Sequence, residues 1–183
     1  MQETKVTLIY WGLSLFVFFA LIPWIFNPIL ALKSIQALAI YGGIIVAFLG
    51  GIIWGWKIEH ASPKNLWIAI GFSILGLLIA LTTFINLTAS LALLIVSLHA
   101  FLRFEKLNSE YFQLNIKYAN ARNLITNLVT ICCITSIAFL RFEKHNSEYF
   151  QHNIKYANAR NLITNLVTIC CITSIAFLNN PYT

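Results

Sequence analysis

Residues 65–102, which read NLWIAIGFSILGLLIALTTFINLTASLALLIVSLHAFL, decide the fold class of this chain. The stretch is 38 residues long, and its only ionisable side chain is His99. A helix crosses the roughly 30 Å hydrocarbon core of a membrane with about 20 residues, because each residue rises about 1.5 Å. The stretch therefore predicts two spanning helices with a tight turn near Asn86. Each span has to be helical, since lipid offers the backbone no hydrogen-bond partners.

The rest of the chain repeats this pattern of long apolar runs between short charged islands. Of its 183 residues, 59% are hydrophobic and 10% are charged, which is too few charges to cover a soluble domain. We predict an all-α fold: a polytopic transmembrane helical bundle of five spans plus a tandem-duplicated sixth. The predicted spans are residues 8–26, 37–56, 66–85, 87–102, 123–140 and 161–178. The tryptophans near predicted ends, as expected of interfacial anchors, are Trp24, Trp54, Trp56 and Trp67.

The first apolar run is predicted to be a span rather than a cleaved signal peptide. It is long and aromatic, and it has no clear small-residue cleavage site.

Residues 101–138 recur almost unchanged as residues 139–176. The period is 38 residues, and 36 of the 38 positions are identical. The pairs that differ are Leu107/His145 and Leu114/His152. Repeats that build a solenoid normally diverge while keeping their core pattern. We therefore interpret this repeat as a recent duplication.

The distribution of Lys and Arg predicts the orientation of the chain, because these residues collect on the cytoplasmic or matrix side of a membrane. Five spans with the N-terminus inside place seven of them inside and only Lys33 outside. A sixth span changes the balance to seven against five. We expect residues 1–140 to form a five-span membrane unit. Residues 139–183 are then a near-identical duplicate of the amphipathic loop and last span. Because a sixth span blurs the charge balance, we expect that one copy of the repeated helix does not span cleanly, or that the duplicate is a tolerated appendix.

Small residues recur every four positions in the second predicted span. They are Ala39, Gly43, Ala47, Gly51 and Gly55. Such residues let two helix backbones approach closely, and packing is the main attraction between helices in lipid. We predict a helix-packing seam here, formed with another helix of this chain or with a second copy.

The first basic loop carries an amphipathic pattern with a spacing of 3, 4, 3 and 4. The apolar positions are Phe104, Leu107, Tyr111, Leu114 and Tyr118. This spacing puts them on one face of a single helix, which could lie in the headgroup plane as an interfacial stripe. In the second copy, His145 and His152 fall on the same stripe, and drift after duplication explains them better than a pH sensor does.

The start of the fifth predicted span has a polar face made by Asn123, Asn127 and Thr130. Polar side chains at such positions usually bond to a neighbouring helix, and a solute path is the alternative.

No predicted span has an acidic or basic residue in its interior, and His99 lies near an end, which disfavours an ion-coupled pump. The adjacent thiols Cys132 and Cys133, copied at 170–171, fit neither zinc nor redox spacing, so we expect small buried residues.

The segment YGGIIVAFLGGIIWG at residues 41–55 carries a family resemblance. Weaker similarities are LIPW at 21–24, LW at 66–67, and Arg122 followed by Leu124 and Thr126. Over about residues 8–140 the chain resembles the small membrane proteins related to transmembrane protein 69, catalogued as a domain of unknown function (number 3429). The resemblance implies a five-span unit in a bacterial or mitochondrial inner membrane, and no biochemical activity. Where the family pattern has a polar or basic residue this chain has Ile53, so any role of that residue would not carry over.

These patterns predict a membrane protein without enzymatic activity, cofactor, metal or nucleic-acid partner. Membrane lipid is the expected partner, with other membrane proteins or self-association beside it. A structural, assembly or interaction role in an inner membrane is the favoured function, and the alternative is a transporter or channel for a small neutral solute. A membrane enzyme ranks last, because only Glu59, His60 and His99 could serve it.

Overall fold

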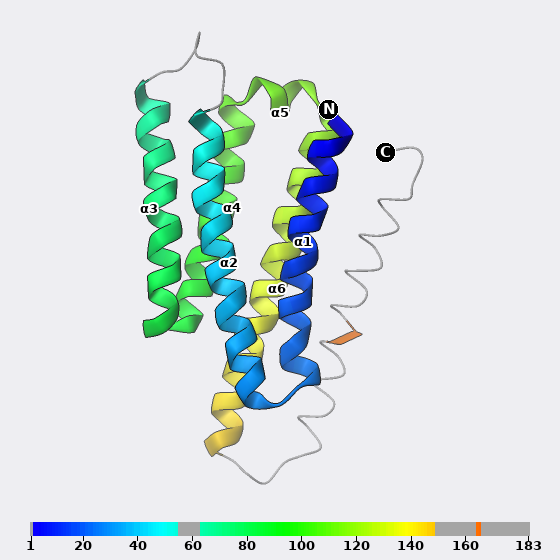
Figure 1. Cartoon of the computed structure of the whole chain (residues 1–183), viewed down its shortest axis with the longest axis vertical. Coiled ribbons are helices and arrows are strands. Elements are labelled where there is room, and N and C mark those ends of the chain that lie inside the picture. The colour runs from blue at the N-terminus through cyan, green and yellow to red at the C-terminus, as the bar shows by residue number, and fades with distance from the viewer. Residues whose placement is uncertain (1, 55–62, 149–163, 166–183) are drawn as a thin grey trace. The chain divides into compact units, whose positions relative to one another are not determined.

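The computed structural model describes residues 2–54, 63–148 and 164–165, and no β-strand occurs in these ranges (Figure 1). This confirms the all-α class. The helices are α1 (Gln2–Ile25), α2 (Pro28–Trp54), α3 (Pro63–Ile85), α4 (Leu87–Asn108), α5 (Glu110–Leu114) and α6 (Ile116–Glu148).

Four of these helices are long and apolar enough to cross a membrane. The four segments are Pro28–Ile53, Asn65–Ile85, Leu87–Asn108 and Ile116–Glu143, and α1 contributes the shorter apolar stretch Trp11–Ile25. The second to fifth predicted spans therefore correspond to helices that are long and apolar enough to cross a membrane. The predicted sixth span lies almost entirely outside the described residues.

Two helices begin at asparagine caps. Asn27 Oδ1 accepts a hydrogen bond from the backbone N–H of Leu30 at 2.9 Å, and Pro28 takes the first helical position of α2. Pro is favoured there because that N–H would have no partner within the helix. Asn86 Oδ1 likewise accepts from the N–H of Ala89 at 3.1 Å. Asn86 is the single residue between α3 and α4, so the tight turn predicted there is confirmed.

The chain divides into two compact units, Met1–Ile35 with Asn127–Thr183, and Gln36–Thr126. In the first unit, α1 buries one helical face made by Leu13, Phe16, Ala20 and Trp24. The Trp24 ring meets Phe139 of α6 edge-on, with ring centroids 5.2 Å apart. The prediction that Trp24 is an interfacial anchor is wrong, because only 2% of this side chain is exposed. Trp67 is 75% exposed, and its role as an interfacial anchor stays a prediction.

In the second unit, α3 and α4 form an antiparallel hairpin joined by polar contacts near its turn. The hydroxyls of Thr83 and Ser90 lie 2.9 Å apart, and Ser90 Oγ donates to the carbonyl oxygen of Ile79 at 2.8 Å. Both residues are buried, so these bonds give their hydroxyl groups the hydrogen-bond partners that lipid does not offer. The hairpin carries aromatic packing too, since Phe72 meets Phe101 with ring centroids 5.2 Å apart.

Candidate functional site

The chain changes direction twice between α4 and α6, at Ser109 and at Asn115. Ser109 has an extended backbone (φ −96°, ψ 112°), its N–H donates to the Glu105 carbonyl oxygen, and its hydroxyl accepts from the N–H of Phe112 at 3.2 Å. Ser109 therefore ends α4 and caps α5. Asn115 Nδ2 donates to the carbonyl oxygen of Tyr111 at 3.1 Å, and α6 begins at the next residue. Ser and Asn favour such ends because their side chains compete for backbone hydrogen bonds.

The prediction of one continuous amphipathic helix through this segment is therefore wrong, and the interfacial stripe is divided among three helices. Leu107 and Leu114 are 76% and 77% exposed. Phe104, Tyr111 and Tyr118 are half-buried. The 3-4 spacing assumes an unbroken helix, and the turns at 109 and 115 rotate the aromatic members away from the two leucines.

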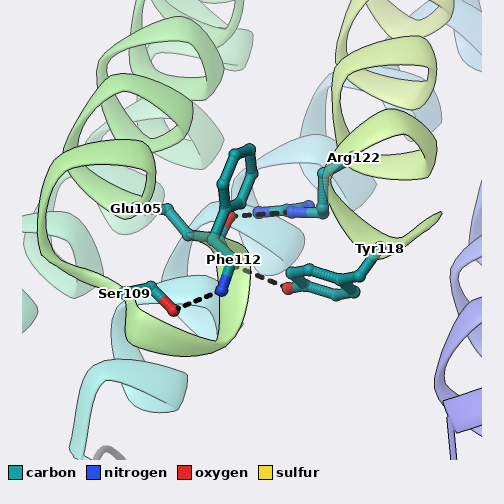
Figure 2. A network of polar contacts seen from close by, with 5 residues as sticks. All are labelled: Glu105, Ser109, Phe112, Tyr118 and Arg122. Atoms are coloured by element: carbon teal, nitrogen blue, oxygen red, sulfur yellow. Dashed lines mark hydrogen bonds and ion pairs between the residues drawn. The ribbon is translucent and has the colours of Figure 1, made fainter. Parts of the chain in front are cut away.

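A buried carboxylate lies behind this turn. Glu105 is only 2% exposed, and both of its carboxylate oxygens have partners (Figure 2). Arg122 Nε donates to Oε2 at 3.0 Å, and the Tyr118 hydroxyl donates to Oε1 at 2.7 Å. We name these three residues the Glu105 cluster. A buried carboxylate is costly unless it is paired, and charge-assisted hydrogen bonds stabilise it most strongly.

Aromatic rings enclose the Glu105 cluster. The Arg122 guanidinium lies 5.4 Å from the ring centroid of Phe101, which is 1% exposed. The Tyr118 ring is 5.0 Å from Tyr111 and 6.1 Å from Phe112, both edge-on. These rings exclude water, which strengthens the ion pair and raises the cost of losing either partner. The cluster thus joins the end of α4 to the start of α6 across α5.

Sequence reasoning counted Arg122 among the cations of the first basic loop and missed its pairing with Glu105. They are 17 residues apart, so no helical spacing joins them. The available signal was that the only acids between residues 65 and 142 are Glu105 and Glu110, and that Glu105 directly follows a long apolar run.

The predicted helix-packing seam on α2 is partly used. Ala39 is buried, and a Cβ added at Gly43 would lie 2.7 Å from the carbonyl oxygen of Gly76 in α3. A Cβ added at Gly76 would lie 2.7 Å from the backbone nitrogen of Ala47. Gly50 lies outside the predicted set, yet a Cβ there would come within 2.7 Å of the Ala69 carbonyl oxygen. Glycine thus permits backbone contact between α2 and α3.

Gly51 does not belong to this contact, because a Cβ added there would meet nothing within 4 Å. Gly55 lies outside the described residues. The physical reason is helical drift: a step of four residues turns the helix by about 40° beyond a full turn, whereas a step of seven falls short by about 20°. Gly43 and Gly50 are seven apart and share a face.

The predicted polar face of α6 does not form one enclosed row. Asn127 is exposed, and Asn123 and Thr130 are half-buried. Its role stays a prediction. Cys132 and Cys133 are buried and form no disulfide, as expected of small core residues.

Candidates for enzymatic or metal chemistry are sparse in the part of the chain that the structure describes. His99 is exposed on α4, and Glu59 and His60 lie outside this part. Within it, no group of three or more His, Cys, Asp or Glu side chains could hold a metal ion.

Long apolar helices with bulky exposed side chains, joined by buried hydroxyls and glycine contacts, define an integral membrane protein of the helical class. Residues 1–138 match the model of the family described as Protein of unknown function (DUF3429), and the chain belongs to that family. Neither the comparison with curated proteins nor that with solved structures found a match. The family match ends where the second copy of the repeat begins.

Proposed function

We propose that this protein has a structural or assembly role in an inner membrane, where it binds other membrane proteins or a second copy of itself. The observation that carries the proposal is the outer face of α3. Its exposed large side chains are Leu66, Trp67, Ile70, Ile74, Leu77, Leu78, Leu81, Phe84 and Ile85. They run the length of the helix, so a neighbouring helix could pack along all of it.

The opposite side of α3 explains why this face is presented. Gly76 and Ala69 bring the α3 backbone against Gly43 and Gly50 of α2. A helix held by backbone contact on one side is rigid, and its other side carries aromatic and branched residues suited to packing. This supports a recognition surface, and lipid covers it when no partner is present.

The resemblance to the relatives of transmembrane protein 69 supports an inner-membrane location, bacterial or mitochondrial. We propose that location together with the five-span topology of residues 1–140. That the protein is not an enzyme and has no nucleic-acid partner belongs to the same proposal.

Site-specific photo-crosslinking in the native membrane tests this role. A benzophenone side chain replaces Leu77, which is 59% exposed on the outer face of α3, and in a matched control it replaces the fully buried Ile79. We expect a discrete, stoichiometric adduct from position 77 and none from position 79. Lipid adducts alone from position 77 would contradict the proposal. Saturable uptake of a neutral solute by liposomes containing only this chain would favour a transporter instead.

A further inference from the structure

The turn that carries the Glu105 cluster on its inside presents a mixed surface on its outside. Three of its apolar side chains are strongly exposed: Leu107 (76%), Leu114 (77%) and Ile116 (73%). Three cations are exposed beside them in the chain: Arg103, Lys106 and Lys117. We call these six residues the α5 patch. It involves α5 and the two helix ends that α5 connects (Figure 1).

The buried ion pair leaves the net charge of the turn unchanged. Glu105 and Arg122 neutralise each other in the interior, so neither contributes to the surface charge. The exposed charges left on the turn are three cations and the carboxylate of Glu110, a net charge of +2. The surface of the turn is therefore basic because of its exposed cations.

Local geometry groups the members of the patch. Lys106 and Leu107 lie three and four residues after Arg103 on α4, so each is a neighbour of Arg103 on the helix surface, while Glu105 points inward. The Gln113 side-chain amide donates to the Lys106 carbonyl oxygen at 3.3 Å. This bond ties the end of α5, and with it Leu114, to the end of α4.

The length of α4 sets the depth of the patch. The uncharged part of α4, residues 87–102, extends about 24 Å at 1.5 Å per residue. This is close to the roughly 30 Å of the hydrocarbon core. With Asn86 at the opposite boundary, the Arg103 backbone lies about 5 Å short of the headgroup level, and the long side chain of Arg103 spans that distance.

We propose that the α5 patch binds anionic phospholipid headgroups. Arg103, Lys106 and Lys117 contact lipid phosphates, and Leu107, Leu114 and Ile116 enter the acyl boundary below them. A bulky apolar group beside cations is the composition of interfacial segments, and anionic surfaces attract such cations. An acidic protein partner would satisfy the cations but would need a separate apolar groove for the three aliphatic side chains. The inference rests on the membrane placement in the proposed function, and not on the assembly role.

Lipid retention by the purified full chain tests the inference. The protein is reconstituted into an equimolar mixture of phosphatidylcholine and phosphatidylglycerol, extracted with its surrounding lipid, and the two lipids are quantified by mass spectrometry. Wild type is compared with Lys106→Gln/Lys117→Gln. The matched control, Lys33→Gln/Arg141→Gln, removes two exposed cations outside the patch.

We expect wild type and control to retain phosphatidylglycerol in excess. The excess should fall about fivefold or more in the patch variant, because each interfacial cation contributes about 1 kcal/mol toward anionic lipid. Leu107→Ser/Leu114→Ser should also lower it. The proposal would be overturned if wild type retained the two lipids in the ratio of the mixture, or if the control lost as much of the phosphatidylglycerol excess as the patch variant. Either result would favour an acidic protein partner. The reconstituted membrane contains no other protein, so a negative result here does not bear on the crosslinking test at α3.

Discussion

Glu105 shows how strongly the surroundings of one residue decide its role. The same seven residues, AFLRFEK, occur at 100–106 and at 138–144. Glu105 is buried against Arg122 and Tyr118, whereas Glu143 in the copy is half-buried on α6. The two acids therefore form a matched pair for measuring what the buried ion pair contributes.

Glu105→Gln is expected to lower the free energy of unfolding by about 3 kcal/mol, because it leaves the Arg122 charge buried without its carboxylate. The measurement is thermal unfolding in detergent, followed by a thiol-reactive dye that gains access to the buried Cys132 and Cys133. Glu143→Gln is the control, and it should change the midpoint much less. Equal midpoints for the two variants would show that the Glu105 cluster does not stabilise the fold.

At the scale of helices, hydroxyl and amide caps decide where this apolar chain turns. Asn27, Asn86 and Ser109 each accept a backbone N–H at a helix start. Ser109 has a counterpart in Ser147, which lies within α6 because that helix continues to Glu148. The same residue type thus ends one helix and sits inside another.

Ser109→Ala is expected to destabilise the protein by about 1 kcal/mol, the usual cost of losing an N-cap. Ser147→Ala should be neutral or slightly stabilising, since Ala is the better helix former. Unfolding midpoints of the two variants in the same detergent check this. A loss from Ser147→Ala as large as that from Ser109→Ala would contradict the difference in their helical placement.

The α2–α3 contact gives a second prediction at this scale. Gly76→Ala should destabilise the protein by about 1–3 kcal/mol, because the added methyl overpacks against the α2 backbone at Gly43 and Ala47. Gly71→Ala in the same helix should stabilise slightly, since a Cβ there meets nothing within 4 Å and Ala is the better helix former. Comparing their unfolding midpoints separates packing from helix propensity. A stabilising Gly76→Ala would show that the two backbones do not touch.

The whole molecule poses the question of how much of the chain forms the folded unit. The family match covers residues 1–138, and the last buried residue described on α6 is Phe139. The five-span unit of residues 1–140 stays a prediction. Beyond them, α6 continues to Glu148, for a total of 33 residues and about 50 Å.

A chain ending after Leu140 is expected to insert into the membrane as abundantly as the full chain, because it retains the family-matched residues and Phe139. A topology reporter after residue 140 should lie on the side opposite the N-terminus. Membrane fractionation and reporter activity, compared with the full chain, check both points. Degradation of the shortened chain, with six clean spans in the full one, would show that the second copy has become part of the fold.

The sequence by itself determined the all-α class, the long apolar helices α2, α3, α4 and α6, and the turn at Asn86. Those features depend on local composition, because a run of about 20 apolar residues can satisfy its backbone in lipid only as a helix. Only the tertiary structure decided the burial of Glu105, the division of the predicted stripe into three helices, and which glycines touch. FLRFEKLNSE at 101–110 ends a helix, and FLRFEKHNSE at 139–148 continues one. The two segments differ at one position, and Glu105 in the first has partners 13 and 17 residues along the chain that no local pattern encodes.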